Sequence, residues 1–225
     1  MKLIFTLFLL TIWSFTSVRS ALTAVDKENL IDAINEARIN VYPTGSNMRE
    51  VKWHQCLADI ALAYQQSCNA GANPNRQTEA LAAGCNASSV AVGETFYFAD
   101  PFTNITSAVG SWSLEGDYYN YTDGSCMSSC GNYIQLVWAE SSYVGCSLYD
   151  QAVCGSSGKI ITCYFATGAN LIETPYTAGA ACSGCVGSWS GCENDLCIKS
   201  SAAATIKMMM FLLIASLLTI LLASV

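Results

Sequence analysis

The chain has a single histidine and few basic residues, and both scarcities limit the chemistry open to it. Ten lysines and arginines stand against 17 aspartates and glutamates in 225 residues. Between residues 21 and 200 the formal charge balance is 7 − 17 = −10. An acidic surface repels the phosphate backbone, so we expect no nucleic-acid partner.

The one histidine, His54, stands beside Trp53 at the predicted start of a helix. An imidazole that acts as a base or as a metal ligand needs partners placed within reach. No residue near His54 in the sequence supplies such a partner. We therefore interpret His54 as a surface or capping residue.

An apolar run opens the chain. Leu3 to Phe15 follow Lys2, and small residues in Val18-Arg19-Ser20 precede Ala21. A short charged start, an apolar centre and small residues at the end are typical of a secretory signal peptide. We predict such a peptide over residues 1–20, and therefore an extracellular or cell-surface location for the mature chain.

A second apolar run, Met208 to Val225, closes the chain and carries no charge. At about 1.5 Å per residue it could nearly cross a hydrocarbon core of about 30 Å. Small residues from Ser200 to Ala204 precede it, and no basic residue follows it. We predict that residues 200–225 are a glycosylphosphatidylinositol (GPI) attachment signal with the lipid anchor on Ser200. The alternative is a single membrane-spanning helix.

Twelve cysteines, an even number, lie between the two apolar ends. In a secreted chain this count indicates a disulfide framework, whose pairing the sequence does not define. Zinc bound by the closely spaced cysteines near the end of this region is the alternative. The predicted disulfide residues are Cys56, Cys68, Cys85, Cys126, Cys130, Cys146, Cys154, Cys163, Cys182, Cys185, Cys192 and Cys197.

Three acceptor sequences for N-linked glycans, Asn-x-Ser/Thr, occur in the same region. They begin at Asn86, Asn104 and Asn120. Each predicts an exposed loop, because the transferred glycan is bulky and needs access to solvent. Three such sequences in one secreted domain indicate a glycoprotein.

Helices are predicted where apolar residues recur at helical spacing. Thr23 to Asp26 resembles a capping box, which begins a helix that Pro43 ends. Residues 53–68 place their apolar side chains on one face, and residues 105–119 form a third candidate. Residues 69–91 are rich in Asn, Ala, Gly and Ser and are predicted to be a loop.

Two strands are predicted late in the chain. Residues 144–149 and 159–165 are rich in β-branched and aromatic side chains, and the second stretch alternates between two faces. The short connection 154–158 indicates a hairpin. Residues 176–197 carry four cysteines and little apolar periodicity, so we expect disulfides to hold them together.

The motif that organises the chain is Gly131-Asn132-Tyr133-Ile134-Gln135-Leu136-Val137-Trp138, followed by Val144-Gly145-Cys146. It resembles the most diagnostic signature of the CAP superfamily: cysteine-rich secretory proteins, antigen 5 and plant pathogenesis-related type 1 proteins. Residues 162–170 are similar to the family's closing strand motif. Asn35 and Arg38 are similar to its first helix motif, and we interpret Arg38 as lying on the rim of that helix.

The resemblance implies an α+β fold, an α-β-α sandwich in which helices cover both sides of a small, mainly antiparallel sheet. It places a CAP domain (also called an SCP domain) at residues 21–175. A small disulfide-rich extension, carried by many secreted animal members, then occupies residues 176–199. The helices and late strands predicted from spacing alone agree with this architecture.

In many relatives two histidines and two glutamates converge in a cleft and can bind a divalent metal. The equivalent residues here are Glu94, Glu115 and Asn132, so an amide replaces one histidine and the other has no counterpart. Two carboxylates and an amide are a poor zinc site, although calcium and magnesium accept oxygen ligands. We expect no metal and no other cofactor. If the two glutamates face each other, one should keep its proton to high pH; two separately solvated glutamates are the alternative.

The resemblance implies binding of a sterol or a fatty acid, and the closing apolar run adds a surface anchor; we expect a non-catalytic protein that binds such a lipid or a cell-surface protein. The helix around Trp112 and the aromatic run Phe96-Tyr97-Phe98 are candidates for the lining of a lipid groove, and ordinary core packing is the alternative for them. Nucleophilic catalysis needs a serine or thiolate beside a base, and the sequence shows no such pair. Two alternatives stay open: a display or signalling domain without a small molecule, and a divalent-metal-dependent hydrolase.

Overall fold

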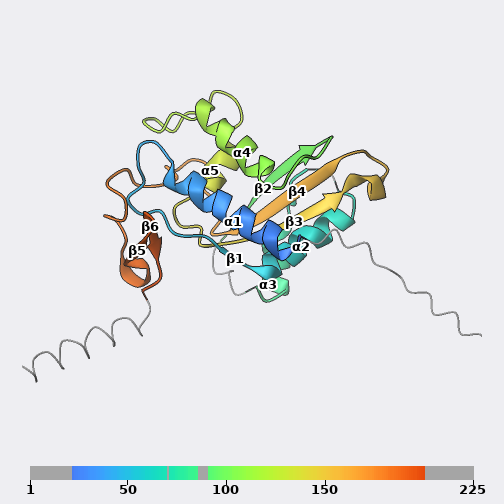
Figure 1. The fold of residues 1–225 in the computed structure, drawn as a ribbon, viewed down its shortest axis with the longest axis horizontal. Helices are drawn as coiled ribbons and strands as arrows, with labels where there is room; N and C mark the ends of the chain where they lie inside the picture. Colours follow the sequence, from blue (N-terminus) through green and yellow to red (C-terminus); the bar gives the residue numbers. More distant parts are fainter. Residues whose placement is uncertain (1–21, 70, 86–90, 201–225) are drawn as a thin grey trace, which may run out of the picture.

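The computed structural model describes residues 22–69, 71–85 and 91–200 (Figure 1). The helices in these ranges are α1 (Ala24–Ile39), α2 (Gln55–Gln66), α3 (Arg76–Ala82), α4 (Ser107–Leu114) and α5 (Gly131–Leu136). The strands are β1 (Lys52–Trp53), β2 (Val92–Ala99), β3 (Tyr143–Asp150), β4 (Lys159–Ala166), β5 (Gly191–Glu193) and β6 (Leu196–Ile198). Short 3-10 helices cover η1 (Glu115–Tyr118), η2 (Gln151–Cys154) and η3 (Gly187–Trp189).

Helix α1 begins at the capping box that the sequence predicts. The Asp26 N–H donates to Thr23 Oγ1 at 3.1 Å, and the Thr23 N–H donates to Asp26 Oδ2 at 2.9 Å. These reciprocal bonds satisfy backbone donors that the first turn of a helix leaves free. The helix ends at Ile39, ahead of Pro43, as expected.

The main sheet has the strand order β1-β3-β4-β2. β3 pairs antiparallel with β4, and β4 pairs antiparallel with β2, whereas β1 joins β3 in parallel. The predicted hairpin and the mainly antiparallel sheet are therefore confirmed. Spacing alone does not predict β2, because this edge strand leaves Phe96 and Phe98 on its surface and its buried residues do not alternate cleanly.

Alternate residues of β4 belong to two different cores. Cys163 and Phe165 pack with the helices α1, α4 and α5 on one side of the sheet. Tyr164 and Ala166 pack with α2 and α3 on the other side. Helices therefore cover both faces of the sheet, and the predicted α-β-α sandwich is confirmed (Figure 1).

Gly145, in the centre of the Val-Gly-Cys motif, explains how closely α2 approaches the sheet. A Cβ atom at this position would collide with the backbone of Ala58 and His54. Only glycine lets the start of α2 lie directly on β3. This part of the motif is thus a packing requirement between a strand and a helix.

Arg38 is buried, and its interpretation as a rim residue is wrong. Its side chain is 1% exposed. The guanidinium donates six hydrogen bonds, all of them to backbone carbonyl oxygens, at 2.8–3.2 Å. The acceptors are Arg49, Leu136, Trp138, Ala139 and Ser141.

Most of these acceptors lie about a hundred residues away from Arg38 in the sequence. Helical spacing places Arg38 at the edge of the apolar stripe, but it cannot show that the segment after α5 folds over that edge. Asn35 acts in a similar way, because its side-chain amide exchanges hydrogen bonds with the backbone of Val51. Both residues of the first helix motif therefore connect distant segments.

The predicted loop 69–91 contains the helix α3, so that prediction is wrong over residues 76–82. The helix has seven residues, and only Ala80 among them is buried. A helix is predicted from apolar residues that recur every three or four positions, and a single buried position cannot form such a pattern. The sequence of α3 therefore does not indicate a helix. Residue 70 and residues 86–90 of the segment lie outside the described ranges.

All twelve cysteines are paired, as expected for a disulfide framework. Cys146 and Cys163 stand directly opposite each other on β3 and β4. The widest sequence separation, 86 residues, belongs to Cys68–Cys154. The other pairs are Cys56–Cys85, Cys126–Cys130, Cys182–Cys192 and Cys185–Cys197.

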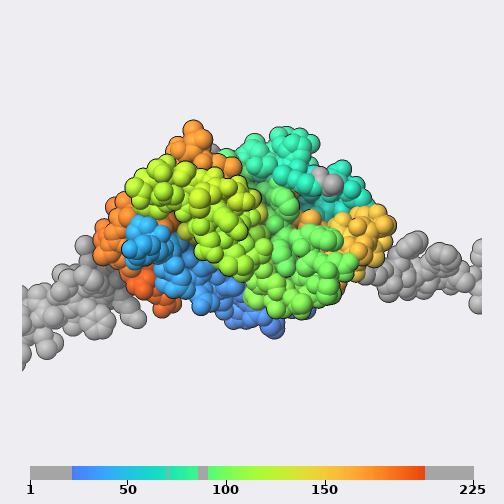
Figure 2. Space-filling view, turned by 90° about the horizontal axis from the view of Figure 1, so that it is seen from above, coloured from blue at the N-terminus to red at the C-terminus, as the bar shows by residue number. Residues whose placement is uncertain are grey.

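The cysteine-rich extension lies against the segment that follows α1 (Figure 2). Its Tyr176 and Leu196 side chains belong to the main core, and the Cys197 N–H donates to the Met48 carbonyl at 2.7 Å. The extension is thus held by its own disulfides and by the domain. Within the part of the chain that the structure describes, no helix is long and apolar enough to cross a membrane. The predicted signal peptide 1–20 and the run 208–225 lie outside that part.

Candidate functional site

A small cleft of about 260 Å³ lies where the family resemblance predicts a metal cavity. Glu94 on β2 and Asn132 on α5 line it, together with Arg76 and Gln135. Glu115 follows α4 and is not among the lining residues. Two of the three predicted cavity residues therefore share the cleft.

Glu115 is occupied by hydrogen bonds to the start of α5. Its Oε2 accepts the backbone N–H groups of Asn132 at 2.9 Å and Tyr133 at 3.1 Å. Its Oε1 accepts the Asn132 side-chain amide at 2.7 Å. The Asn132 side-chain oxygen Oδ1 in turn accepts the Phe96 N–H of β2 at 3.2 Å. This chain of bonds joins η1, α5 and the edge strand.

Glu94 is a buried carboxylate with a separate set of partners. Its side chain is 5% exposed, it accepts the Asn73 N–H at 2.9 Å, and Arg76 Nη1 lies 3.9 Å away. Burial raises the pKa of Glu94, while the Asn73 hydrogen bond and the Arg76 charge oppose that rise. The raised pKa therefore comes from desolvation of Glu94 itself, and each glutamate has donors of its own.

These residues do not fit a divalent metal. Glu115 already accepts three N–H groups, and the Asn132 oxygen accepts a fourth. The only cation beside Glu94 within the described ranges is Arg76. In those ranges no three His, Cys, Asp or Glu side chains gather as a metal would require. Protein donors thus surround both Glu94 in the cleft and Glu115 beside it.

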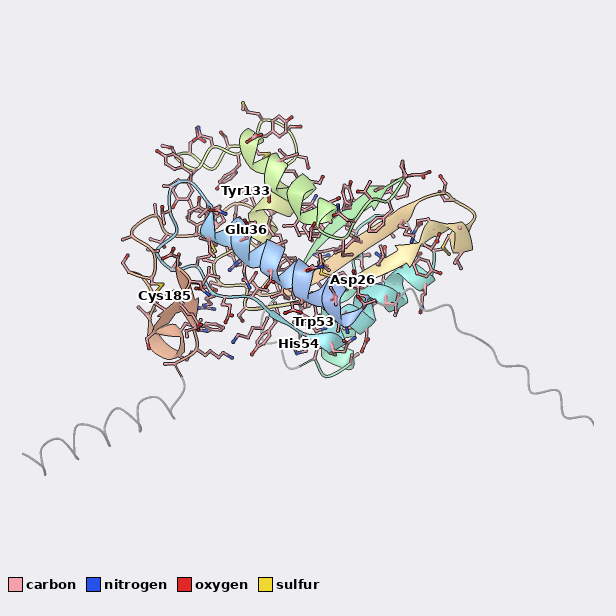
Figure 3. The ribbon with its side chains drawn as sticks, in the orientation of Figure 1. Asp26, Glu36, Trp53, His54, Tyr133 and Cys185 are labelled. Atoms are coloured by element: carbon pink, nitrogen blue, oxygen red, sulfur yellow. A yellow bond between two sulfur atoms is a disulfide. The ribbon has the colours of Figure 1, made fainter. Side chains whose placement is uncertain are left out.

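His54 lies far from this cleft. It occupies the N-cap position of α2 without a side-chain capping bond, and its ring meets the edge of Tyr143 at 5.5 Å between centroids. Figure 3 shows it at the opposite end of α1 from Tyr133, a neighbour of Asn132 in the motif. It therefore takes no part in the cleft.

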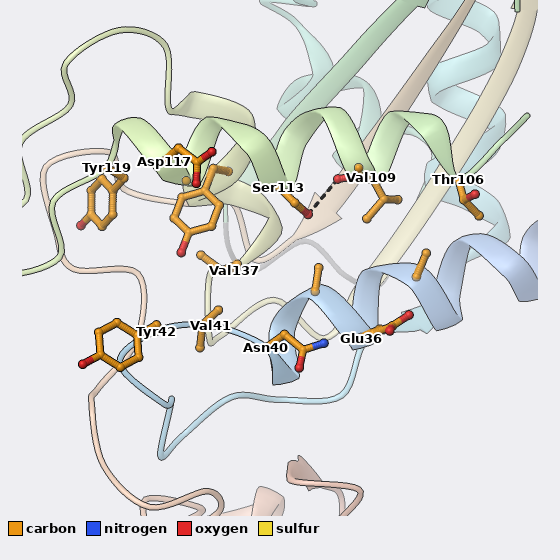
Figure 4. A pocket seen from close by; sticks show the side chains of 15 residues that line it. Glu36, Asn40, Val41, Tyr42, Thr106, Val109, Ser113, Asp117, Tyr119 and Val137 are labelled. Atoms are coloured by element: carbon orange, nitrogen blue, oxygen red, sulfur yellow. Dashed lines mark hydrogen bonds between the residues drawn. The ribbon is translucent and has the colours of Figure 1, made fainter. Parts of the chain in front are cut away.

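A larger groove of about 630 Å³ runs between α1 and α4 (Figure 4). Small and apolar side chains form much of its wall, among them Ala33, Ala37, Val41, Val109 and Val137. Polar residues are interspersed along it: Glu36, Asn40, Tyr42, Thr106, Ser113, Asp117, Tyr119 and Tyr133. The lining thus combines apolar walls with separate hydrogen-bonding groups, which is typical of a ligand site.

Two local features keep the groove open on the α4 side. Gly110 lines it, and a Cβ atom at this position would meet nothing within 4 Å. The Ser113 hydroxyl turns back to donate to the Val109 carbonyl at 2.9 Å, so this polar side chain stays close to its own helix (Figure 4). Neither residue therefore extends a side chain across the groove.

Of the two segments expected to line a lipid groove, the helix around Trp112 borders the large groove and the strand of Phe96 to Phe98 does not; lipid binding itself stays a prediction. Residues of α4 line the large groove, but Trp112 itself is 1% exposed and donates to the Phe96 carbonyl at 2.9 Å. Phe96 lines the small cleft instead, and Phe98 is 51% exposed. The α1 wall could not be foreseen, because spacing does not show which two helices lie side by side.

The structure describes two of the three predicted glycosylation sites and the predicted anchor residue. Asn104 and Asn120 are exposed, and each stabilises a local turn through its side-chain oxygen. Asn86 lies outside the described residues. Ser200, the predicted anchor residue, is exposed at the end of the described chain. Glycosylation and anchoring remain predictions.

Comparisons with known proteins agree with the geometry. The model of the CAP family, described as the cysteine-rich secretory protein family, matches residues 31–165. Peptidase inhibitor 16 of Mus musculus is 32% identical over 190 residues, which cover 81% of this chain and 35% of that protein. GLIPR1-like protein 1 of Bos taurus is 34% identical over 176 residues, which cover 72% of this chain and 67% of that protein. The chain thus spans about a third of the length of the mouse relative.

Two solved structures show the same fold. Schistosoma mansoni venom allergen-like protein 4 superposes with a TM-score of 0.55 at 22% identity, covering 70% of this chain and 97% of that one. Na-ASP-1 superposes with a TM-score of 0.62 at 16% identity, covering 80% of this chain and 49% of that one. The family match over residues 31–165, together with the sandwich and its disulfides, shows that the chain belongs to the CAP family of cysteine-rich secretory proteins.

Proposed function

We propose that this protein is an extracellular, non-catalytic CAP domain that holds a lipid in the groove between α1 and α4. The observation that supports the proposal is the groove itself. Its volume of about 630 Å³ falls in the range of small-molecule sites, and the apolar side chains of Ala33, Ala37, Val41, Val109 and Val137 line it among polar ones. An aliphatic chain placed there gains roughly 0.8 kcal/mol for each CH₂ group that leaves water.

The chemistry of the described residues favours binding over catalysis. Every cysteine is in a disulfide, so no thiolate is available as a nucleophile. His54 lies away from both the cleft and the groove. Glu115 already accepts three N–H groups, and Glu94 accepts the Asn73 N–H beside the Arg76 guanidinium. A lipid site needs none of these groups.

Anchoring at the cell surface is a second part of the proposal. The groove belongs to the domain, and Ser200 stands at the far end of the extension, so an anchor there leaves the groove accessible. Expression of the full chain in animal cells tests this part. Phosphatidylinositol-specific phospholipase C should release the protein if a GPI anchor is present, whereas a membrane-spanning helix would resist release.

A substitution that fills the groove tests whether it is the lipid-binding site. The full chain is expressed in a secretory host, and its lipid ligands are identified by mass spectrometry of what co-purifies. Gly110→Phe places a ring into the open space beside α4, so it should abolish lipid binding and leave the fold intact. Gly110→Ala adds only a methyl group and serves as the matched control, which should keep binding close to that of the wild type.

The outcome separates two functions. Saturable binding that Gly110→Phe removes supports the lipid-carrying function. A folded, fully oxidised protein that binds neither sterol nor single-chain lipid would contradict it. The alternative is then a display or signalling domain, to be tested by a search for a cell-surface protein partner.

A further inference from the structure

Four cationic and aromatic side chains form a continuous cluster between the cysteine-rich extension and the main domain. Lys199 Nζ lies 5.2 Å from the ring centroid of Trp189 and 5.2 Å from that of Tyr143, and it donates to the Tyr143 hydroxyl at 3.0 Å. The Arg49 guanidinium lies 5.3 Å from the Trp189 ring. Both cations are attracted by the ring faces. We call Arg49, Tyr143, Trp189 and Lys199 the cation–aromatic cluster.

Within the described ranges the two cations of the cluster form no ion pair. The acidic chain has seven lysines and arginines between residues 21 and 200, and Arg49 and Lys199 are two of them. The ion pairs found in the described ranges involve other residues. Glu140 lines a small hollow of about 120 Å³ at Trp189, but Arg49 donates to its backbone carbonyl, at 3.1 Å. Both cations can therefore pair with an anion outside the protein without displacing a carboxylate.

Glu193, in the hairpin of β5 and β6, belongs to a different side of the extension. It lines a pocket together with Asp32 and Glu36 of α1 and with Glu50. No residue of the cation–aromatic cluster lines that pocket, and none of these four carboxylates lines the hollow at Trp189. The acidic pocket and the cluster are thus separate surfaces.

The described chain ends beside the cluster, at a position that hydrogen bonds define. The Ser200 N–H donates to the Ser188 carbonyl at 3.1 Å, and the Ser190 hydroxyl donates to Ser200 Oγ at 3.3 Å. Ser188 and Ser190 flank Trp189 in the sequence. Only residues 201–207 separate Ser200 from the closing apolar run, and seven residues span at most about 25 Å. A lipid on Ser200 and a membrane-spanning helix would therefore both hold the cluster close to a bilayer.

We infer that the cation–aromatic cluster is a membrane-contact surface, which binds the phosphate groups of the bilayer that holds this chain's own anchor. The inference rests on the proposed anchoring and adds the orientation of the domain on the membrane. Arg49 and Lys199 pair with lipid phosphates. Trp189 and Tyr143 lie at the level of the head groups, where amphipathic aromatic rings are favoured. Val186, which is 74% exposed and lines the hollow at Trp189, adds apolar surface to the contact.

Quenching of tryptophan fluorescence from within the bilayer tests the inference. The full chain is expressed in animal cells, extracted with its anchor, and reconstituted in phosphatidylcholine vesicles with and without bromine on the acyl chains. Trp112 and Trp138 are buried in the domain, so brominated lipid should act mainly on Trp189. The quenching should be lost in Trp189→Phe. It should be kept in Trp53→Phe, which removes a half-buried tryptophan outside the cluster.

Charge variants show whether the cations hold the contact. Arg49→Gln together with Lys199→Gln should lower the ratio of docked to undocked protein roughly ten-fold, and with it the quenching. High salt should weaken the quenching of the wild type in the same way. The matched control is Lys159→Gln, because Lys159 also lies over an aromatic ring, 5.6 Å from that of Phe102. It belongs to the β3–β4 hairpin, at the opposite end of the domain from the extension (Figure 1), and its loss should leave the quenching unchanged.

Two results would overturn the inference: equal quenching in Trp189→Phe and the wild type, or a loss in Lys159→Gln equal to that in the double variant. The proposed anchoring fails in a different way. A protein that leaves the cells without phospholipase and does not stay with the vesicles has no anchor, and the membrane-contact surface falls with it. A protein that stays with the vesicles while brominated lipid leaves Trp189 unquenched is anchored, and only the inference is then wrong.

Discussion

Arg38 shows how one side chain can hold several segments of this domain. Burial and the nearby charge of Arg49 lower the pKa of Arg38 to about 9, so the guanidinium still carries its charge at neutral pH. Five carbonyl oxygens, which accept six hydrogen bonds, replace the water that it loses. No carboxylate takes part, so the stabilisation is a charge–dipole interaction that spans α1 and the segments around residues 49 and 136–141.

Replacing Arg38 should therefore be among the most damaging single changes. Arg38→Met leaves the carbonyls without donors, and we expect a loss of about 4 kcal/mol or more in the free energy of unfolding. Arg38→Lys keeps the charge but offers three donors in place of the guanidinium fork, and should lose about half as much. Denaturant unfolding under oxidising conditions measures both.

The control for Arg38 is Arg49→Lys, because Arg49 donates only one side-chain bond, to an exposed carbonyl at Glu140. This change should cost less than about 1 kcal/mol. An Arg38→Met protein as stable as the control would show that the six hydrogen bonds contribute little.

Glu94 should give the domain a distinctive pH dependence. Its pKa is raised in the folded state, so the folded protein keeps this proton above pH 4.5, the ordinary pKa of a glutamate, where the unfolded chain has lost it. The folded state then binds more protons, and its stability falls as the pH rises through that window. Glu94→Gln removes the titrating group and should lose less stability between about pH 4 and pH 7 than the wild type does.

Unfolding free energies of both proteins across this pH range check the prediction. Glu28→Gln, an exposed change on α1, serves as the control and should follow the wild-type profile. Parallel profiles for the wild type and Glu94→Gln would contradict a raised pKa at Glu94.

At the scale of elements, α1 serves both as a wall of the groove and as the support for Arg38. Its first turn is fixed by a local device, the capping box of Thr23 and Asp26. Its middle is fixed by Leu30 and Ile34, both fully buried. The position of the groove wall thus depends on a helix whose start is determined by neighbouring residues and whose packing is determined by the rest of the domain.

Loss of the cap should weaken α1 without affecting the groove directly. Thr23→Ala removes the acceptor for the Asp26 N–H and should cost about 1 kcal/mol. Thr23→Ser keeps a hydroxyl in the same place and should cost no more than a few tenths of a kcal/mol. Thermal unfolding of the pair measures the difference, and equal midpoints would show that the exposed cap is not needed.

At the scale of the whole molecule, disulfides connect elements that share few apolar contacts. Cys68–Cys154 ties the end of α2 to η2, next to the β3–β4 hairpin, across 86 residues. Cys182–Cys192 closes a separation of only 10 residues within the extension. Both bonds lie near the surface, so replacing their cysteines by serine leaves no large cavity.

The long bond should stabilise the folded state more than the short one does. Loop-closure entropy predicts a loss of about 4.6 kcal/mol for the double change Cys68→Ser with Cys154→Ser. The same relation predicts about 2.7 kcal/mol for Cys182→Ser with Cys192→Ser. Denaturant unfolding of the two variants measures both losses, and the reverse order would show that strain or residual structure outweighs chain entropy.

Some helices and strands of this domain could be predicted from the spacing of apolar residues in the sequence, and others could not. The capping box, the three longer helical stretches and the β3–β4 hairpin follow from residues close in sequence, and all of them are observed. The helix α3 and the strand β2 were not predicted, because short or exposed elements leave little periodicity. The motif around Asn132 identified the family, although Asn132 stands where the family resemblance predicts a histidine.

By itself the sequence located the family motif and indicated a disulfide framework, because both rest on residue types and short spacings, and the family resemblance implied the fold class. The tertiary structure alone decided that Arg38 is buried, that Glu115 bonds to Asn132, and that α1 and α4 enclose a groove. Those features join segments far apart in the chain. The local pattern of either segment cannot carry that information, since it is created only when the segments pack together.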